Sequence, residues 1–224
     1  MASSADDDLQ ASTTEGFKVG EKKTVEEYAK LDQNDESLNR WKASLGISSS
    51  PPIPVDPKDQ RRCVIKSLAL EVEGRPDITI DLTAPGSVEA LKSKPFTIKE
   101  GAQFRMKATF VVQHDVLSGL KYLQVTKRKG IKVATAQEMI VSLPIEYVHE
   151  RWAILRSLTK RGTQGSFAPN TQEKPIYEKK FDPDEAPSGM LARGHYDAVS
   201  KFQDDDKHDY LKFEWSFDIT KEWK

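Results

Sequence analysis

The chain contains a single cysteine, Cys63, so no disulfide can form within it. All of its apolar runs are far shorter than the ~20 residues that a membrane-spanning helix needs. The first ten residues, MASSADDDLQ, are acidic and polar, unlike the apolar centre of a secretion signal. The net charge of −1 gives no overall attraction to nucleic acid. These absences favour a cytoplasmic protein that neither spans a membrane nor binds nucleic acid.

Motifs of catalysis are also missing. The histidines at positions 114, 149, 195 and 208 show no metal-ligand or catalytic spacing, and there is no Gly-rich phosphate loop or nucleophile elbow. The acidic residues at 204–206 and 209 lack the alternating ligands, the glycine and the distal glutamate of an EF-hand loop, so a charged turn is the better interpretation. We therefore expect no enzyme activity, no metal and no cofactor.

The first quarter of the chain differs in composition from the rest. Residues 1–23 are acidic and nearly free of large apolar side chains, which predicts disorder. Residues 24–46 predict two short helices, the first with a Thr24–Glu27 capping box and the second capped by Asn34 or Asp35. Residues 47–60 form a Pro/Ser-rich linker. The helices could pack on the following domain or on a partner, and the linker favours the partner.

From Cys63 onwards the apolar period changes from helical to alternating. Phe104, Met106, Ala108, Phe110 and Val112 alternate with polar neighbours. The segments 68–72, 78–82, 196–202 and 211–219 do the same. Strict alternation places one face of a strand in a core and the other in water. The pattern predicts an antiparallel β-sandwich over residues 61–224.

Three features of the predicted strands carry further expectations. Lys127 to Lys129 with Gly130 resemble a hairpin tip, in which Gly130 supplies a positive φ. Cys63 begins an apolar run and is expected to be a buried small hydrophobe. The aromatic stripe Phe213, Trp215 and Phe217 is either ordinary core or the wall of a space between the sheets. Periodicity alone does not separate these two interpretations.

Several segments resemble one family, the Rho GDP-dissociation inhibitors, with a fungal type of sequence. The arm segment LDQNDESL at 31–38, FTIKEG at 96–101 and VLSGLKY at 116–122 carry the resemblance in the first half. EAPSGMLARG at 185–194, FQDDDK at 202–207 and residues 215–223 carry it in the second half. These motifs occur in the family's order, so together they are much more specific than any one of them.

The resemblance implies an immunoglobulin-like, antiparallel β-sandwich with a flexible, partly helical N-terminal arm. The arm would lie on the switch regions of a prenylated Rho- or Rac-type small GTPase and hold it in its GDP-bound state. The sandwich would take the GTPase's geranylgeranyl chain between its sheets. Such a protein would extract its partner from a membrane surface that it contacts transiently.

The resemblance also implies individual site residues. In the arm and near the GTPase surface these are Asp35, Ser37, Leu38, Trp41 and Asp206. Asp35 is also a natural helix cap, and the two roles are compatible. Each prenyl position could equally be ordinary core, and Ala198 is smaller than the usual residue there, which would widen the pocket. The implied prenyl-binding positions are Leu70, Phe96, Phe104, Val116, Tyr122, Leu191, Ala198 and Trp215.

Residues 141–164 interrupt the family pattern. Joining Ile140 to Gly165 restores the motif that continues through Ser166, Phe167 and Pro169. Val141-Ser142 can be encoded by GTAAGT and Gln164 by CAG, which are typical intron boundaries. We interpret the segment as a retained intron translated in frame, or as a gene-model error, with a genuine loop insertion between strands as the alternative.

Three other functions fit the sequence less well. A prenyl-binding shuttle that does not inhibit nucleotide release would not need the helical arm. An enzyme would need a catalytic constellation that the sequence lacks. An immunoglobulin-like adhesion domain would need a secretion signal.

Overall fold

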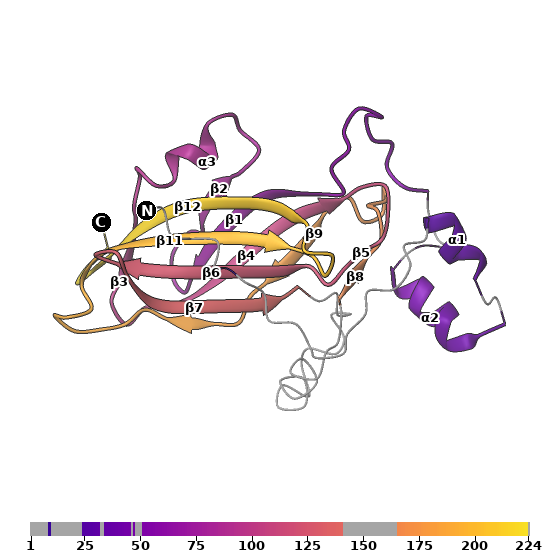
Figure 1. The fold of residues 1–224 in the computed structure, drawn as a ribbon. Coiled ribbons are helices and arrows are strands. Elements are labelled where there is room, and N and C mark those ends of the chain that lie inside the picture. The colour runs from indigo at the N-terminus through magenta and orange to yellow at the C-terminus, as the bar shows by residue number, and fades with distance from the viewer. Residues whose placement is uncertain are drawn as a thin grey trace.

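The computed structural model describes Leu9 and residues 24–31, 34–45, 47, 51–140 and 165–223. In these residues two five-stranded sheets face one another, with a two-stranded ladder at one end (Figure 1). This confirms the predicted immunoglobulin-like sandwich. No helix among the described residues is long and apolar enough to cross a membrane.

The first sheet, here called sheet B, is built around the long strands β1 (Cys63–Val72) and β4 (Gln103–Val112). Its order is β10-β4-β1-β2, with β9 also paired to β4, and all of its pairs are antiparallel. The shorter strands are β2 (Ile78–Asp81), β9 (Tyr177–Lys180) and β10 (Asp184–Glu185).

The second sheet, sheet C, has the order β3-β12-β11-β6-β7. Its strands are β3 (Phe96–Lys99), β6 (Lys121–Arg128), β7 (Ile131–Met139), β11 (Gly194–Gln203) and β12 (Asp209–Thr220). The β3–β12 pair is parallel, which the expectation of an antiparallel sandwich did not include. Helix α3 (Ser87–Ala90) lies beside β12 at this edge.

The β6–β7 hairpin confirms the predicted tip. Lys129 and Gly130 join the two strands, and their φ angles of 50° and 79° are both positive. A two-residue loop with two positive φ angles twists in the same sense as the strands that it connects, and glycine adopts that conformation without steric cost.

The sandwich is packed differently at its two ends. At one end, the closed end, Phe110, Tyr122, Phe167, Tyr177 and Phe202 are all buried. Phe110 lies 5.1 Å from Phe167 and 5.5 Å from Tyr177 between ring centroids. At the other end, the open end, the facing side chains of β1, β2, β3, β4 and β12 leave a cleft, and six of the ten that line it are partly exposed.

The two-stranded ladder, β5 (Leu117–Ser118) with β8 (Ser166–Phe167), continues the register of the β6–β7 hairpin. In β6–β7, the two residue numbers of each pair sum to 260, from Lys121↔Met139 to Thr126↔Ala134. In β5–β8 they sum to 284. The difference, 24, is the length of segment 141–164. Between the two ladders, Ile140 N donates to Leu120 O at 2.8 Å and Gly119 N to Gly165 O at 2.9 Å. Residues 140 and 165 therefore hold the positions of neighbours on one strand.

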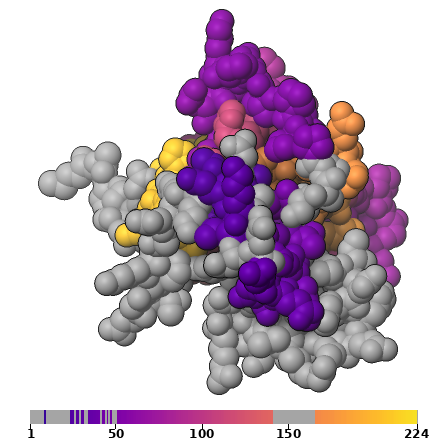
Figure 2. Space-filling view, turned by 90° about the vertical axis from the view of Figure 1, so that its right-hand side faces the viewer, coloured from indigo at the N-terminus to yellow at the C-terminus, as the bar shows by residue number. Residues whose placement is uncertain are grey.

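The N-terminal arm consists of α1 (Val25–Lys30) and α2 (Glu36–Leu45). Both predicted caps are confirmed: Thr24 and Glu27 form the capping box, and the Asp35 carboxylate accepts a hydrogen bond from Leu38 N at 3.0 Å. The Lys42 ammonium donates to Leu31 O and so ties the two helices together. The helices lie beyond the closed end of the sandwich (Figure 1), and Figure 2 faces that end with the arm in front.

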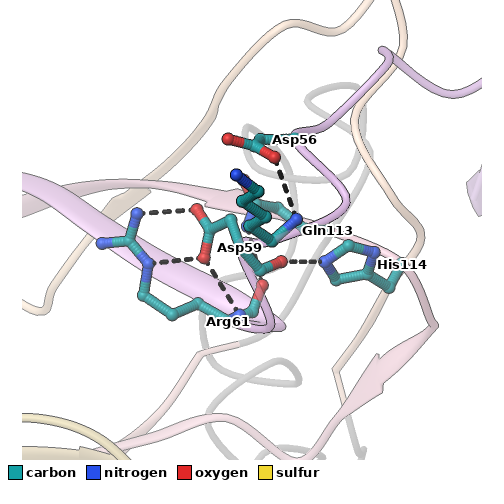
Figure 3. Close-up of polar contacts among 6 residues, drawn as sticks. Asp56, Asp59, Arg61, Gln113 and His114 are labelled. Carbon is teal, nitrogen blue, oxygen red and sulfur yellow. Dashed lines mark hydrogen bonds and ion pairs between the residues drawn. The ribbon is translucent and has the colours of Figure 1, made fainter.

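The last part of the linker is bound to the sandwich (Figure 3). The Asp59 carboxylate accepts from the Arg61 guanidinium at 2.7 and 2.8 Å, and the His114 ring nitrogen contacts Asp59 O at 2.6 Å. Upstream, Ile53 N donates to Asn170 O at 2.8 Å. These bonds fix the point at which the arm leaves the closed end.

Candidate functional site

The cleft at the open end lies between the two sheets and has a volume of about 40 Å³. All ten residues that line it are apolar: Leu68, Ala69, Leu70, Ile78, Ile80, Phe96, Ile98, Met106, Phe213 and Trp215. A cleft without polar groups in its wall suits a hydrocarbon chain and offers nothing to a polar ligand.

Strand alternation accounts for this wall. Leu68 and Leu70 on β1 and Ile78 and Ile80 on β2 are paired across the ladder and point to the same side of sheet B. Phe213 and Trp215 project from β12 in sheet C with the same period of two. The Trp215 ring meets Phe96 of β3 in an edge-to-face pair, with ring centroids 6.2 Å apart.

A polar contact behind the wall fixes the orientation of Trp215. Its indole Nε1 donates to Ser200 Oγ at 2.9 Å, and the Tyr122 hydroxyl lies 2.8 Å from the same oxygen. Ser200 is completely buried, and burial raises the pKa of the Tyr122 phenol, so the phenol stays neutral. The polar atom of Trp215 is thus satisfied inside the protein while its ring faces the cleft.

The structure brings three of the eight expected prenyl positions, Leu70, Phe96 and Trp215, into the wall of the cleft. Tyr122 and Ala198 lie on the inner face of sheet C, next to Ser200 and Trp215 rather than in the wall. The other three lie further away.

Phe104 is half-buried on β4, where it pairs with Val72. Val116 is buried at the closed end, where its carbonyl accepts from Arg62 Nη2 at 3.3 Å. Leu191 is 88% exposed in the loop that leads into β11. None of the three lines the cleft.

Seven wall residues were not among the expected prenyl positions, although Phe213 belongs to the aromatic stripe interpreted as core or wall: Leu68, Ala69, Ile78, Ile80, Ile98, Met106 and Phe213. The signal for several of them was present, because Ile78, Ile80, Met106 and Phe213 occupy alternating positions in predicted strands. Alternation says which side of a strand faces inward. It does not say at which end the two sheets separate.

The expected GTPase-binding residues of the arm lie on or beside α2. Asp35 and Ser37 are exposed and Leu38 is half-buried, while the side chain of Trp41 lies outside the described part of the structure. Asp35 already acts as the N-cap of α2, so its carboxylate is held at the start of the helix.

Asp206 lies at the closed end, the same end as the arm. Its carboxylate is 3.6 Å from Arg62 Nη1, next to the start of β1. The neighbouring Asp204 is buried and accepts from Tyr210 OH at 2.7 Å and His208 N at 2.9 Å. Burial, followed by the bond to Asp204, raises the pKa of the Tyr210 phenol. These bonds make the 204–208 turn a fixed support for Asp206.

Cys63 is buried as expected. Burial, with a smaller contribution from the Asp204 charge, raises the pKa of its thiol to about 12, so the thiol is neutral and unreactive at physiological pH. In the residues that the structure describes, no group of three or more His, Cys, Asp or Glu side chains is arranged to hold a metal.

An apolar cleft between two sheets, with a separate helical arm at the other end, is the architecture of a binding protein for an apolar chain. Comparison with known families agrees: the model described as RHO protein GDP dissociation inhibitor matches residues 2–152 and 145–222. The chain therefore belongs to the Rho GDP-dissociation inhibitor family, whose members are regulators and not enzymes. The two matched ranges meet within segment 141–164.

Individual relatives support the same assignment. The Rho GDP-dissociation inhibitor of Schizosaccharomyces pombe is 43% identical over 206 residues, which cover 92% of this chain and 86% of the relative. That of Saccharomyces cerevisiae is 42% identical and covers 92% of this chain and 90% of the relative. Human Rho GDP-dissociation inhibitor 1 is 34% identical, covering 93% of this chain and 87% of the relative.

Proposed function

We propose that this protein binds geranylgeranylated Rho- or Rac-type GTPases in their GDP-bound state and removes them from membranes into the cytoplasm. The wall of the open-end cleft, made only of apolar residues, is the observation that carries the lipid part of this proposal. Family membership supports the GTPase part.

The energetics of burial favour extraction. A C20 isoprenoid gains on the order of 10 kcal/mol from burial, before costs, at ~0.8 kcal/mol per methylene. A membrane offers the same chain a similar gain, so transfer between the two is close to balanced. Contacts between the arm and the GTPase then add a second attachment, which shifts the balance towards the complex and makes it selective.

The arm is proposed to contact the switch regions through Asp35, Ser37, Leu38 and Trp41, with Asp206 as a further contact from the sandwich. The positions support this division of roles, because Asp206 and the linker anchor Asp59 lie at the closed end, away from the cleft. The remaining expected prenyl positions, Phe104, Val116, Tyr122, Leu191 and Ala198, are kept as proposed contacts of the bound lipid. Leu191 is exposed on the loop that leads into β11.

Segment 141–164 is proposed to be an insertion into an otherwise continuous hairpin, from a retained intron or as a long loop. The unbroken register across residues 140 and 165 supports this proposal, as does the meeting of the two family matches inside the segment. Transcript sequencing across the junction separates the two origins. Reads that all contain the segment would exclude the intron.

The test of the lipid site is release of a geranylgeranylated, GDP-loaded Rho-type GTPase from liposomes. Ile78→Asp places a charge in the cleft wall, and we expect it to abolish release. Thr79→Asp, on the same strand but with its exposed side chain on the other face, is the matched control and should release as well as the parent. Equal release by both variants, with folding confirmed, would overturn the assignment of the cleft.

A further inference from the structure

The outward face of sheet C carries an apolar strip that is not exposed to solvent. Leu123, Val125 and Val199 lie on this face, because their strand neighbours Tyr122, Ser200 and Phe202 point into the core. Leu123 and Val125 are nevertheless only 3% and 1% exposed. The side chain that packs on them is Leu9, itself 2% exposed, and the four residues form a cluster separate from the main core.

The sequence around Leu9 explains why this residue is the anchor. Leu9 is the only large apolar side chain between Met1 and Phe17, and it directly follows Asp6, Asp7 and Asp8. A segment of this composition cannot form a core of its own. It can bury one apolar side chain on an existing surface.

Lysines on four strands surround the strip. Lys201 lies directly opposite Leu123 in the β11–β6 ladder and opposite Lys212 in the β11–β12 ladder. Lys127 lies directly opposite Lys132 in the β6–β7 ladder. Residues directly opposite in an antiparallel pair share a face, and Lys127 is two residues from Val125, so the four lysines surround the strip on the outward side. Asp197, Asp209 and Glu214 offset part of this charge. Lys201 lies 3.4 Å from Asp209, and Glu214, which is opposite Val199, forms an ion pair with Lys92.

We propose that the outward face of strands β6 and β11 is a docking surface for this chain's own acidic N-terminal segment, with Leu9 as the apolar anchor and Asp6 to Asp8 facing the lysines. The contact is independent of the arm. The 14 residues from Gln10 to Lys23, which join the anchor to the arm, span at most about 50 Å when extended. The docking surface lies on the opposite side of sheet C from the cleft.

The test uses the full chain, free of any GTPase, with a nitroxide label at Ala5→Cys. Cys63 does not compete for the label, because it is buried with a raised pKa. We expect selective broadening of the methyl signals of Leu123, Val125 and Val199. Leu9→Asp should reduce this broadening to background. Leu9→Met, and Gln10→Asp, which adds the same charge as Leu9→Asp, should retain the broadening.

The role of the charges is tested separately. Lys127→Glu combined with Lys212→Glu should weaken the broadening, and so should ~1 M salt, at which the Debye length is about 3 Å. Broadening that survives Leu9→Asp, or that falls on other strands, would overturn the docking site. Broadening that is lost with Leu9→Asp but insensitive to salt and to the lysine variants would overturn the role of the charges.

Discussion

The two ends of the sandwich use the same kind of residue for different purposes. At the closed end, aromatic rings from both sheets fill the space between them, and Phe110 and Phe202 are completely buried. At the open end, equally apolar residues such as Ile78, Met106 and Trp215 remain partly exposed around a cleft. Apolar area at the closed end is already removed from water and stabilises the fold. At the open end it is left for a ligand, so stability and binding should respond to substitutions at opposite ends.

The largest difference between effects on stability and effects on lipid binding is expected from a pair of side-chain truncations, one at each end. Phe110→Ala leaves a cavity between Phe167 and Tyr177 and should lower the free energy of unfolding by about 3–5 kcal/mol. Ile78→Ala, on the half-buried wall of the cleft, should cost less than about 1.5 kcal/mol but weaken binding of a geranylgeranylated peptide. Urea unfolding and lipid titration measure the two effects. A comparable loss of stability from both variants would contradict the division between the ends.

Gly119→Ala tests the packing of the closed end without removing any atoms. Gly119 has a φ of 67°, and a Cβ built on it would lie 1.8 Å from the Asp205 carboxylate. That carboxylate pairs with Lys121 at 2.8 Å, and both side chains are largely buried. We expect a loss of about 2–4 kcal/mol, because the substitution combines backbone strain with displacement of a buried ion pair. Gly130→Ala, with a similar φ of 79° and open space around it, is the matched control and should show the strain alone.

Removal of residues 141–164 should stabilise the closed end. The deletion joins β7 to β8 in one register, and it removes the entropy cost of closing a 24-residue loop. The expected gain in the free energy of unfolding is on the order of 1–3 kcal/mol. Since the junction is at the closed end, lipid affinity should not change. Failure of the shortened chain to fold would show that the segment is part of the native structure.

The sequence allowed the strands, the helix caps and the hairpin tip to be predicted, because each depends on neighbours in the chain. The parallel pairing of β3 with β12 could not be predicted, since it joins Phe96 to Phe217 and leaves no local pattern. The cleft was predictable only in part. Leu70, Phe96 and Trp215 followed from the family resemblance, but Ile78 and Met106 have the same alternation as buried Phe110. Whether an inward-facing residue lines a cleft or a core depends on the separation of the sheets.

Ser200→Ala tests the link between the two ends, because Ser200 contacts both Tyr122 at the closed end and Trp215 in the cleft wall. Without the serine hydroxyl, the Trp215 indole N–H loses its acceptor, and the cost is about 1–3 kcal/mol if no water replaces it. The Trp215 ring should then move, which shifts its indole N–H resonance and weakens lipid binding several-fold. Ser67→Ala is the matched control, because Ser67 Oγ contacts Thr109 Oγ1 at 2.6 Å outside the cleft. It should leave the Trp215 resonance and the lipid affinity unchanged.

The smallest expected effect on stability comes from the ionisation of Glu138, whose side chain lies on the packed side of β7. Burial raises the pKa of the Glu138 carboxyl above its ordinary value of 4.5, and its Oε1 accepts from Asp182 N at 3.3 Å. A raised pKa means that the folded state holds this proton more tightly than the unfolded state does. The contribution of Glu138 to stability is therefore lost as the pH rises from about 4.5 through the folded-state pKa.

Glu138→Gln removes that charge and keeps the acceptor for Asp182 N. The variant should be more stable than the parent at pH 7, by no more than about 0.5 kcal/mol for a partly exposed site. The difference should shrink below pH 4, where the parent glutamate is also neutral. Chemical unfolding at the two pH values measures both quantities. A variant that is less stable at pH 7 would show that the ionised carboxylate is favoured by the attraction of Lys179, which would then outweigh its burial.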